Sequence, residues 1–401
     1  MNILIIYPYL FTKNSKHGMG KQISTFVSEL TQQGDEIKMI SLSEVSFSKE
    51  HIQENDFIFS DYYVVERKLP STFQRILNYF LITPPPHSRN LLSKEVIKIL
   101  KEKISFNNID LVLIITVDAC CYLKYIDASS NCLIICDTQE IQSRHYLSKF
   151  RNAKFSFKKI HILVVYLLEL FYEKKIAKVI DGIITISKAE KEYFQTKINN
   201  RLPIHIMPPL VGARFGNTKI EDYNCNIVFI GSFNHTPNID AIRWFIFKIF
   251  PLIAKMNDKA HVYIVGVNAE KALAFVQHPK IRIIGEVEDI NYWYNRAGVF
   301  ISPILTGGGA RIKNIEALAH GCAMVTTKLG SEGMEEAADN CFLVAENEEH
   351  FAKQVCFLLE NPIFALKMGE RAKIYVNNKH DASLRIEEFK KYIQSIKDEI
   401  C

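Results

Sequence analysis

Short runs of consecutive apolar residues recur along the chain, separated by amphipathic or polar stretches. In the first half, such runs lie at residues 2–7, 36–42, 110–117, 132–136 and 181–187. Between the first two runs, residues 22–33 carry apolar side chains at helical spacing, and Gly34 follows them. This order predicts a strand, a helix that ends at the glycine, and a returning strand. Apolar runs that alternate with helices are typical of parallel strands buried on both faces, so the pattern predicts a doubly wound α/β domain.

The same alternation starts again after a proline-containing stretch at residues 199–216. Apolar runs follow at residues 226–230, 261–265, 280–284, 299–301 and 322–327. Residues 239–256 predict a helix, whereas residues 43–108 are hard to order. Because 401 residues are too many for one compact core, we expect two domains, residues 1–205 and 206–381. An amphipathic helix is expected within residues 382–401.

The stretch after the apolar run 299–301 carries the strongest sign of chemistry. It contains a short glycine run and then charged residues at the start of a helical pattern: Gly307, Gly308, Gly309, Ala310, Arg311, Lys313 and Glu316. Glycines let the backbone approach a ligand closely, and the first amides of a helix lack intrahelical partners. The helix dipole and two cationic side chains add positive charge, which predicts a diphosphate site. Glu316, about one turn further on, is suited to accept hydrogen bonds from ribose hydroxyls.

This stretch resembles the signature of family 4 (group 1) retaining glycosyltransferases, in the branch with a GGGxRxK motif. The Glu-Ala-Leu-Ala helix that follows and the Gly-x-Glu-Gly turn at residues 330–333 belong to the same signature. The resemblance implies a GT-B fold, in which two doubly wound Rossmann-like domains face a central cleft and the C-terminal helix packs back on the first, acceptor-side domain. It also implies transfer of a sugar from a nucleoside-diphosphate sugar to a glycan, lipid-linked or other acceptor, with retention and without a metal.

The resemblance implies roles for several residues of the second domain. Arg311 and Lys313 are the expected catalytic residues, because they would stabilise the departing diphosphate. Gly231 and Ser232 would face the diphosphate from the other side, and the backbone of Val287 would bind the base. The amides of residues 307–310 would complete the nucleotide-sugar site.

On the acceptor side, the resemblance points to His17, Gly20, Lys21, Gln139 and Arg144. His17 and Lys21 could face a phosphate or an acceptor group, although two polar residues in such a loop are more often simply solvated. Gln139 stands where many relatives have a histidine, and a glutamine cannot transfer a proton near neutral pH. Gly308 stands where many relatives have a glutamate that contacts the sugar. These departures leave a second function open, a catalytically inactive GT-B protein that acts as a binding or scaffold partner in glycan assembly.

Residues 150–178 mix basic and apolar residues, with a nearly uninterrupted apolar centre at residues 160–171. This centre is too short to span a bilayer, which takes about 20 residues. Two interpretations remain: a buried helix, or a helix on an anionic membrane surface whose lysines point to the head groups. The lysines in question are Lys154, Lys158, Lys159, Lys174 and Lys175.

Composition and short motifs argue against several other classes of protein. The net charge of +5 is small for this length and gives no case for nucleic acid. Nine scattered cysteines lack metal-like spacing and are expected to be reduced. No Asp-x-Asp sequence is present to hold a metal, and the first strand is not followed by the Gly-x-Gly-x-x-Gly of a dinucleotide oxidoreductase. The N-terminus does not resemble a signal peptide, so a cytoplasmic location is expected, with peripheral contact to the inner face of the membrane in the second interpretation above.

Overall fold

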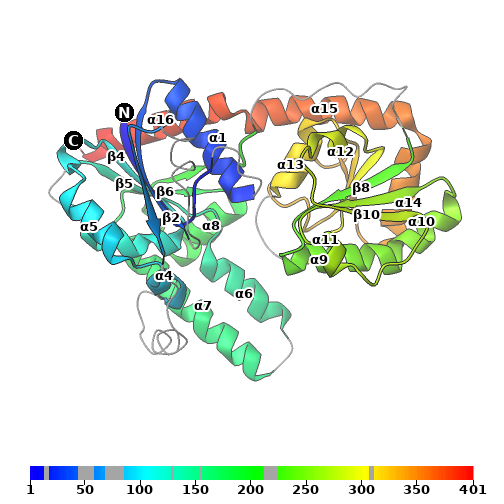
Figure 1. The fold of residues 1–401 in the computed structure, drawn as a ribbon, viewed down its shortest axis with the longest axis horizontal. Helices are drawn as coiled ribbons and strands as arrows, with labels where there is room; N and C mark the ends of the chain where they lie inside the picture. Colours follow the sequence, from blue (N-terminus) through cyan, green and yellow to red (C-terminus); the bar gives the residue numbers. More distant parts are fainter. Residues whose placement is uncertain are drawn as a thin grey trace. The chain divides into compact units, whose positions relative to one another are not determined.

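The computed structural model describes residues 1–12, 18–43, 58–67, 85–127, 131–153, 156–211, 224–306 and 311–400. The chain divides into two compact units (Figure 1). Unit 1 comprises Met1–Leu210 and Ala382–Cys401, and unit 2 comprises Val211–Asp381. The sequence places the boundary at 205/206, five residues before the boundary between the units, and the C-terminal helix clusters with unit 1.

Unit 1 is built on a parallel sheet that has seven strands in the described residues, in the order β3-β2-β1-β4-β5-β6-β7. The strands are β1 (Asn2–Tyr7), β2 (Glu36–Ser43), β3 (Asp61–Glu66), β4 (Leu111–Ile115), β5 (Leu133–Asp137), β6 (Gly182–Thr185) and β7 (Ile204–Ile206). The helices are α1 (Gly18–Gln32), α4 (Pro86–Asn90), α5 (Lys94–Glu102), η1 (Phe106–Asn108), η2 (Val117–Tyr125), α6 (Gln142–Asn152), α7 (Phe157–Ile176), α8 (Lys188–Lys197) and α16 (Ala382–Ile400).

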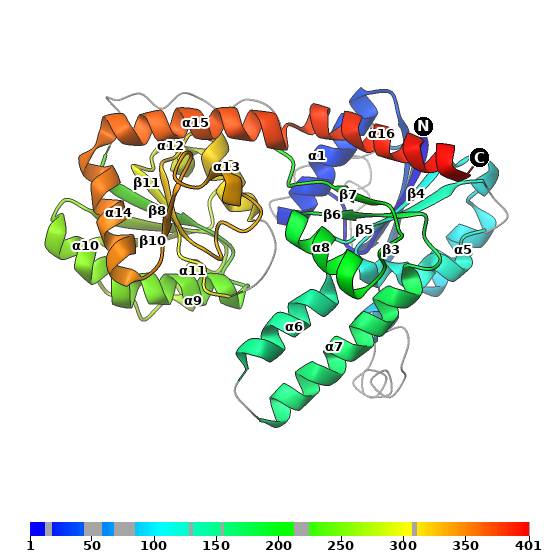
Figure 2. The same ribbon diagram turned by 180° about the vertical axis from the view of Figure 1, so that it is seen from behind.

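Alternate side chains of the central strands of unit 1 enter two separate cores, as the two-residue period of a strand requires. Ile3 and Ile5 of β1 pack in one core with residues of α1 and α16, among them Phe26 and Phe389. Leu4 and Ile6 pack in the other core, which α5, η2, α7 and α8 complete. Helices therefore cover both faces of the sheet, which accounts for its uninterrupted apolar strands (Figures 1 and 2).

Unit 2 repeats this architecture with a parallel sheet of six strands in the described residues, in the order β10-β9-β8-β11-β12-β13. The strands are β8 (Asn226–Ile230), β9 (His261–Val265), β10 (Ile281–Gly285), β11 (Val299–Ser302), β12 (Met324–Thr327) and β13 (Leu343–Ala345). The helices are α9 (Thr236–Trp244), the π-helical η4 (Phe245–Ile249), α10 (Phe250–Met256), α11 (Ala269–Ala272), α12 (Asn291–Asn295), α13 (Ile312–Ala319), η5 (Glu335–Ala337), α14 (Glu348–Glu360) and α15 (Pro362–His380).

The predicted fold class is confirmed, because both sheets are parallel and doubly wound. The expected helix at residues 239–256 is also present, as the continuous run of α9, η4 and α10. Three strands were not predicted. β3 lies in the region that the sequence does not order, β7 lies inside the expected proline-containing linker, and β13 follows the last predicted strand. All three are edge strands, which pair with a single neighbour. Such strands can form from sequences that have few consecutive apolar residues, so the apolar pattern does not reveal them.

The prediction of a buried helix within residues 150–178 holds for one face of α7 and is wrong for the other. Two helices, α6 and α7, occupy this region, and Phe157, Ile160, Val164, Leu167 and Phe171 of α7 are all exposed. Apolar side chains therefore lie on both faces of α7, but the protein buries only one of these faces. In the described part of the chain, no helix combines the length and apolar character that crossing a bilayer requires.

Candidate functional site

The strand order of unit 2 reverses direction between β8 and β11. From β8 the chain runs outward through β9 and β10, and from β11 it runs outward in the opposite direction through β12 and β13. In doubly wound sheets, ligands bind beyond the carboxyl ends of the strands at such a switch point. The segments after β8 and β11 contain Gly231, Ser232, Arg311 and Lys313, so the topology brings these predicted residues to one edge of the sheet.

The segment after β8 is fixed by hydrogen bonds to the end of β9. The backbone N–H of Gly231 donates to the carbonyl of Val265 over 3.0 Å, and that of Phe233 donates to the carbonyl of Val267 over 2.9 Å. The two segments approach so closely that a Cβ at Gly266 would lie 1.9 Å from the carbonyl oxygen of Gly231. Gly266 also has a φ of +143°, so a glycine is required there.

Asn238 joins this segment to α13. Its side-chain amide donates to the carbonyl of Ser232 over 2.8 Å, and its carbonyl oxygen accepts from the ammonium of Lys313 over 2.9 Å. The sequence analysis did not assign a role to Asn238. Its place at the end of the Gly-Ser-Phe-Asn-His-Thr-Pro-Asn run, in the first turn of α9, is the signal that could have identified it.

Two cations meet at the start of α13. Arg311 is the N-cap residue, and Lys313 lies in the first turn. The Lys313 ammonium sits 4.0 Å from the centre of the Phe229 ring, in a cation–π contact. Burial, and to a smaller extent the neighbouring Arg311 guanidinium, hold the pKa of Lys313 well below its usual range. The site therefore places positive charges side by side where the dipole of α13 is also positive.

Glu316 is oriented by an aromatic residue of α12. The hydroxyl of Tyr294 donates to a carboxylate oxygen of Glu316 over 2.9 Å. The Tyr294 ring is buried and stacks on His320, with the ring centres 4.9 Å apart. The imidazole of His320 is in turn within 2.9 Å of the Asn295 side chain. Tyr294 was also missed by the sequence analysis, because its distance from Glu316 along the chain gives no periodic signal.

The Gly-x-Glu-Gly turn at residues 330–333 packs against α13. Asn314 is fully buried, and its side chain donates to the carbonyl of Gly330 over 2.8 Å. A Cβ at Gly330 would lie 2.1 Å from the hydroxyl oxygen of Thr326. This part of the signature therefore has a structural reason, since it fixes the turn after β12 against the inner face of α13.

Val287 follows β10 at the same carboxyl edge, is half-buried, and packs against one of the two cores of unit 2. Gly307, Gly308, Gly309 and Ala310 lie outside the described residues, as does His17 in unit 1. Among the residues that the structure describes, no group of three or more histidines, cysteines or acidic residues could hold a metal ion.

Unit 1 has its own switch point, between β1 and β4. Gly20 is buried and Lys21 exposed in the first turn of α1, which follows β1. Thr116 and Gln139, at the carboxyl ends of β4 and β5, have φ values of +73° and +54°. Such values are strained for residues with a side chain, and strain of this kind clusters at functional sites.

Gln139 is bonded to Asp137, the last residue of β5. The Gln139 side-chain amide donates to one Asp137 oxygen over 2.7 Å, and its backbone N–H donates to the other over 3.2 Å. Burial raises the pKa of Asp137 to about 6, although the two bonds from Gln139 act in the opposite direction. The Gln139 side chain thus holds a buried carboxylate. Arg144 is half-buried on α6, next to His145, whose ring lies 2.8 Å from Glu140.

Comparison with known proteins gives a family match for part of unit 2. Residues 224–361 match the family model described as "Glycosyl transferases group 1". A curated relative, an uncharacterized 44.6 kDa protein in the cps region of Klebsiella pneumoniae, is 27% identical over 248 residues. That match covers 59% of this chain and 62% of the relative, so the chain spans less than two thirds of its length.

Solved structures match over nearly the whole chain. TarM superposes with a TM-score of 0.74 at 11% identity, covering 98% of this chain and 99% of that one. Sucrose-phosphate synthase from Thermosynechococcus elongatus gives a TM-score of 0.68 at 12% identity, covering 98% and 100%. A mutant of S. aureus TarM in complex with Fondaparinux, alpha-GlcNAc-glycerol and UDP gives 0.70 at 10% identity, covering 98% and 100%. The chain therefore has the GT-B fold, and its residues 224–361 match the group 1 glycosyltransferases.

Proposed function

We propose that the chain is a retaining glycosyltransferase of the GGGxRxK branch. It moves a sugar from a nucleoside-diphosphate sugar to a glycan, lipid-linked or other acceptor without a metal ion. The observation that carries this proposal is the pair of cations at the start of α13, with Lys313 held by Asn238 and Phe229 at the switch point of unit 2. A diphosphate has the charge and size to offset both cations together.

The reaction follows from where charge develops. When the bond between the anomeric carbon and the diphosphate breaks, negative charge grows on the leaving phosphate oxygen. Fixed cations that gain interaction as this charge grows lower the barrier. Arg311 and Lys313 take this role, and the amides of residues 307–310 add to it. On a retaining path, the departing phosphate takes the proton of the acceptor hydroxyl, so a glutamine at position 139 is compatible with turnover.

The other residues bind the donor. Glu316, held by Tyr294, accepts hydrogen bonds from the ribose hydroxyls. Gly231 and Ser232 contact the diphosphate, and the backbone of Val287 reads the base. UDP is the first nucleotide to test, since the S. aureus TarM mutant structure contains it; GDP is the second. The acceptor binds on unit 1, and the residues proposed to contact it are His17, Gly20, Lys21, Gln139 and Arg144.

The test has two stages. UDP- and GDP-sugars are screened by thermal shift, and the sugar that stabilises the protein is followed for hydrolysis and for transfer to glycan acceptors. Proton NMR of the product gives the anomeric configuration, and a chelator tests the metal dependence. Donor binding with neither hydrolysis nor transfer would overturn the enzymatic proposal in favour of a binding or scaffold protein. Activity abolished by chelation would overturn the metal-independent mechanism.

A further inference from the structure

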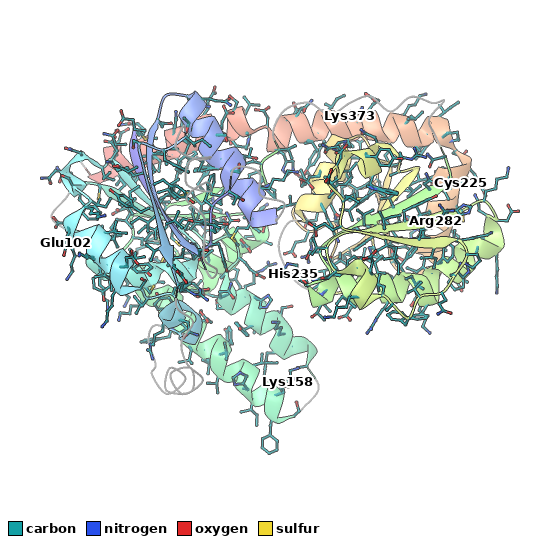
Figure 3. All side chains as sticks on the ribbon, in the orientation of Figure 1. Glu102, Lys158, Cys225, His235, Arg282 and Lys373 are labelled. Carbon is teal, nitrogen blue, oxygen red and sulfur yellow. The ribbon has the colours of Figure 1, made fainter. Side chains whose placement is uncertain are left out.

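Helices α6 and α7 lie side by side and extend away from the sheet of unit 1 (Figures 1 and 2). Lys158, near the start of α7, lies at the far end of this pair (Figure 3). We call α6 and α7 together the hairpin. The inward face of α7 is buried from the middle of the helix to its C-terminal end, through Val165, Glu169, Tyr172, Glu173 and Ile176. The donor site proposed above does not involve the hairpin, so its outer surface needs a separate explanation.

An apolar stripe runs along the opposite face of α7. Its side chains are exposed by 92% at Phe157, 50% at Ile160, 49% at Val164, 53% at Leu167 and 55% at Phe171. Their spacing of three and four residues keeps them on one face of a helix. The stripe extends for about 21 Å at the rise of an α-helix. An apolar row of this length on a helix exposed to water marks an interaction surface.

The charged residues in the region of the stripe are predominantly basic. Residues 142–178 contain nine lysines and arginines but two acidic residues, Glu169 and Glu173, so their formal charge is +7. The rest of the chain has 40 basic and 42 acidic residues, a formal charge of −2. Both glutamates are buried on the inward face of α7. Residues 142–178 thus carry the whole positive excess of the protein, and both of their carboxylates are buried.

The lysines are placed where the stripe ends. Lys174 and Lys175 are exposed and follow Phe171 by three and four residues, so they continue the same face. Lys158 is also exposed, at the other end of α7, but as the residue next to Phe157 it lies off the stripe. A helix with apolar side chains along one face and cations that continue that face has the pattern of a helix that lies in a membrane interface.

We propose that the outer face of α7 docks the protein on a bilayer surface that contains anionic lipid. The stripe enters the boundary between head groups and acyl chains, and Lys174 and Lys175 contact the lipid phosphates. The observations favour this occupant over a second copy of the chain, because pairing two hairpins would bring two surfaces with an excess of positive charge together. Docking would hold unit 1 near lipid-linked molecules, but it does not depend on the chain being a glycosyltransferase.

The experiment measures binding of the full chain to vesicles by flotation. Vesicles of phosphatidylcholine alone are compared with vesicles that also contain phosphatidylglycerol. Binding is expected to the second kind and to weaken with added salt, because salt screens the attraction between lysines and lipid head groups. Replacing Lys174→Gln and Lys175→Gln together should lower the partition coefficient about 25-fold, at about fivefold for each lysine near the surface. Lys353→Gln with Lys367→Gln, exposed lysines of unit 2, is the matched control and should change nothing.

A second pair of variants tests whether the apolar stripe contributes to membrane binding. Ile160→Ser with Leu167→Ser should reduce binding at least about tenfold, since each removes apolar surface that enters the interface. Ile363→Ser with Ile374→Ser is the control, because both isoleucines are 62% exposed on α15 of unit 2. Thermal melts and donor hydrolysis of all variants report whether folding or the donor site has changed.

A fluorescent probe gives a second readout. Both native tryptophans, Trp244 and Trp293, are in unit 2. In Phe157→Trp, an emission shift to shorter wavelength is expected on adding the anionic vesicles. Three results would overturn the proposal: no binding to either kind of vesicle, equal binding to both, or binding that the stripe variants leave unchanged. A dimer in sedimentation that becomes monomeric in Ile160→Ser with Leu167→Ser would identify a second copy as the occupant instead.

Discussion

Unit 1 buries carboxylates whose pKa values are raised, whereas unit 2 has a half-buried lysine whose pKa is lowered. Burial raises the pKa of Asp137 to about 6, of Glu173 to about 7 and of Glu169 to about 9. In unit 2, burial lowers the pKa of Lys313. The carboxylates can be neutralised by taking up a proton, and Asp137 and Glu173 also have hydrogen-bond donors within the protein. Lys313 donates to Asn238 and lies over Phe229, but its charged neighbour is a second cation, Arg311, whose charge those two contacts do not offset.

The surroundings of a buried ionisable group indicate whether it contributes to structure or to ligand binding. A buried charge that its own surroundings satisfy or neutralise contributes to structure. A buried charge next to a charge of the same sign disfavours the empty state and favours a bound ligand of opposite sign. At the start of α13, the diphosphate proposed above would offset both charges, and measurements at several pH values test the buried groups of each unit.

The largest effect is expected from Glu169, whose carboxylate oxygens are both buried without a hydrogen-bond partner among the described residues. Its pKa is raised from 4.5 to about 9, mainly by burial and further by Asp118 and Glu173. The folded state keeps the proton while the unfolded state releases it, so stability is lost as pH rises above the unfolded pKa. The free energy of unfolding should fall by about 1.4 kcal/mol per pH unit within this window.

The Glu169→Gln variant tests this slope by urea unfolding at several pH values. The amide cannot ionise, so the variant should show a flatter profile than the unaltered chain. Glu192→Gln changes an exposed glutamate of α8 and should leave the profile as it was. An unchanged slope in Glu169→Gln would mean that this carboxylate is hydrated or paired in solution.

The next effect concerns Arg311 in unit 2. Arg311→Ala is expected to lower transfer more than donor binding, by about 2–4 kcal/mol in the barrier, if the guanidinium acts on charge that develops at the leaving phosphate. Steady-state kcat and KM, with the donor Kd from calorimetry, separate the two contributions. Equal losses in affinity and turnover would contradict a role in the transition state.

The sequence predicted the strands around both switch points because central parallel strands are apolar on both faces, which leaves an uninterrupted run. It also predicted the start of α13, where glycines, cations and a helical period follow one another. It could not predict contacts between residues distant in the chain. Asn238 and Lys313, or Tyr294 and Glu316, meet because the fold brings the start of α9, and likewise α12, next to α13.

The region 150–178 shows a different limit of sequence reasoning. Its apolar residues lie at positions compatible with burial on any side of α7, and composition cannot say which side is covered. Glu169 and Glu173 look like surface residues in the sequence, yet they lie inside, whereas Phe157 and Phe171 lie outside. Which face a helix buries depends on the sheet and helices beside it, and the local sequence does not contain that information.

Lys313 provides a smaller effect that separates binding from stability. Lys313→Met keeps the length of the side chain but removes the charge, its hydrogen bond to Asn238 and its contact over Phe229. Because a half-buried cation next to Arg311 is costly, the variant without ligand should be as stable as the original or more stable by about 1 kcal/mol. UDP should no longer raise its melting temperature. A large loss of stability without ligand would show that Lys313 is a structural residue.

A pH series on UDP binding tests the same residue in the unaltered chain. A bound diphosphate favours charged Lys313, so binding should take up protons and weaken as pH rises through the lowered pKa. Calorimetry in buffers of different ionisation enthalpy measures this uptake. The uptake should be absent in Lys313→Met, whereas uptake that persists there would assign it to another group.

The smallest effect is expected from Tyr294→Phe. The variant keeps the ring that stacks on His320 and removes the hydroxyl that donates to Glu316. If this bond orients the carboxylate for the ribose, affinity for UDP should fall by about 1 kcal/mol. Affinity for 2′-deoxy-UDP should change less, because that ligand lacks one of the hydroxyls that Glu316 would bind. Equal losses for both nucleotides would show that Tyr294 supports the packing of α12 and α13 and does not position Glu316.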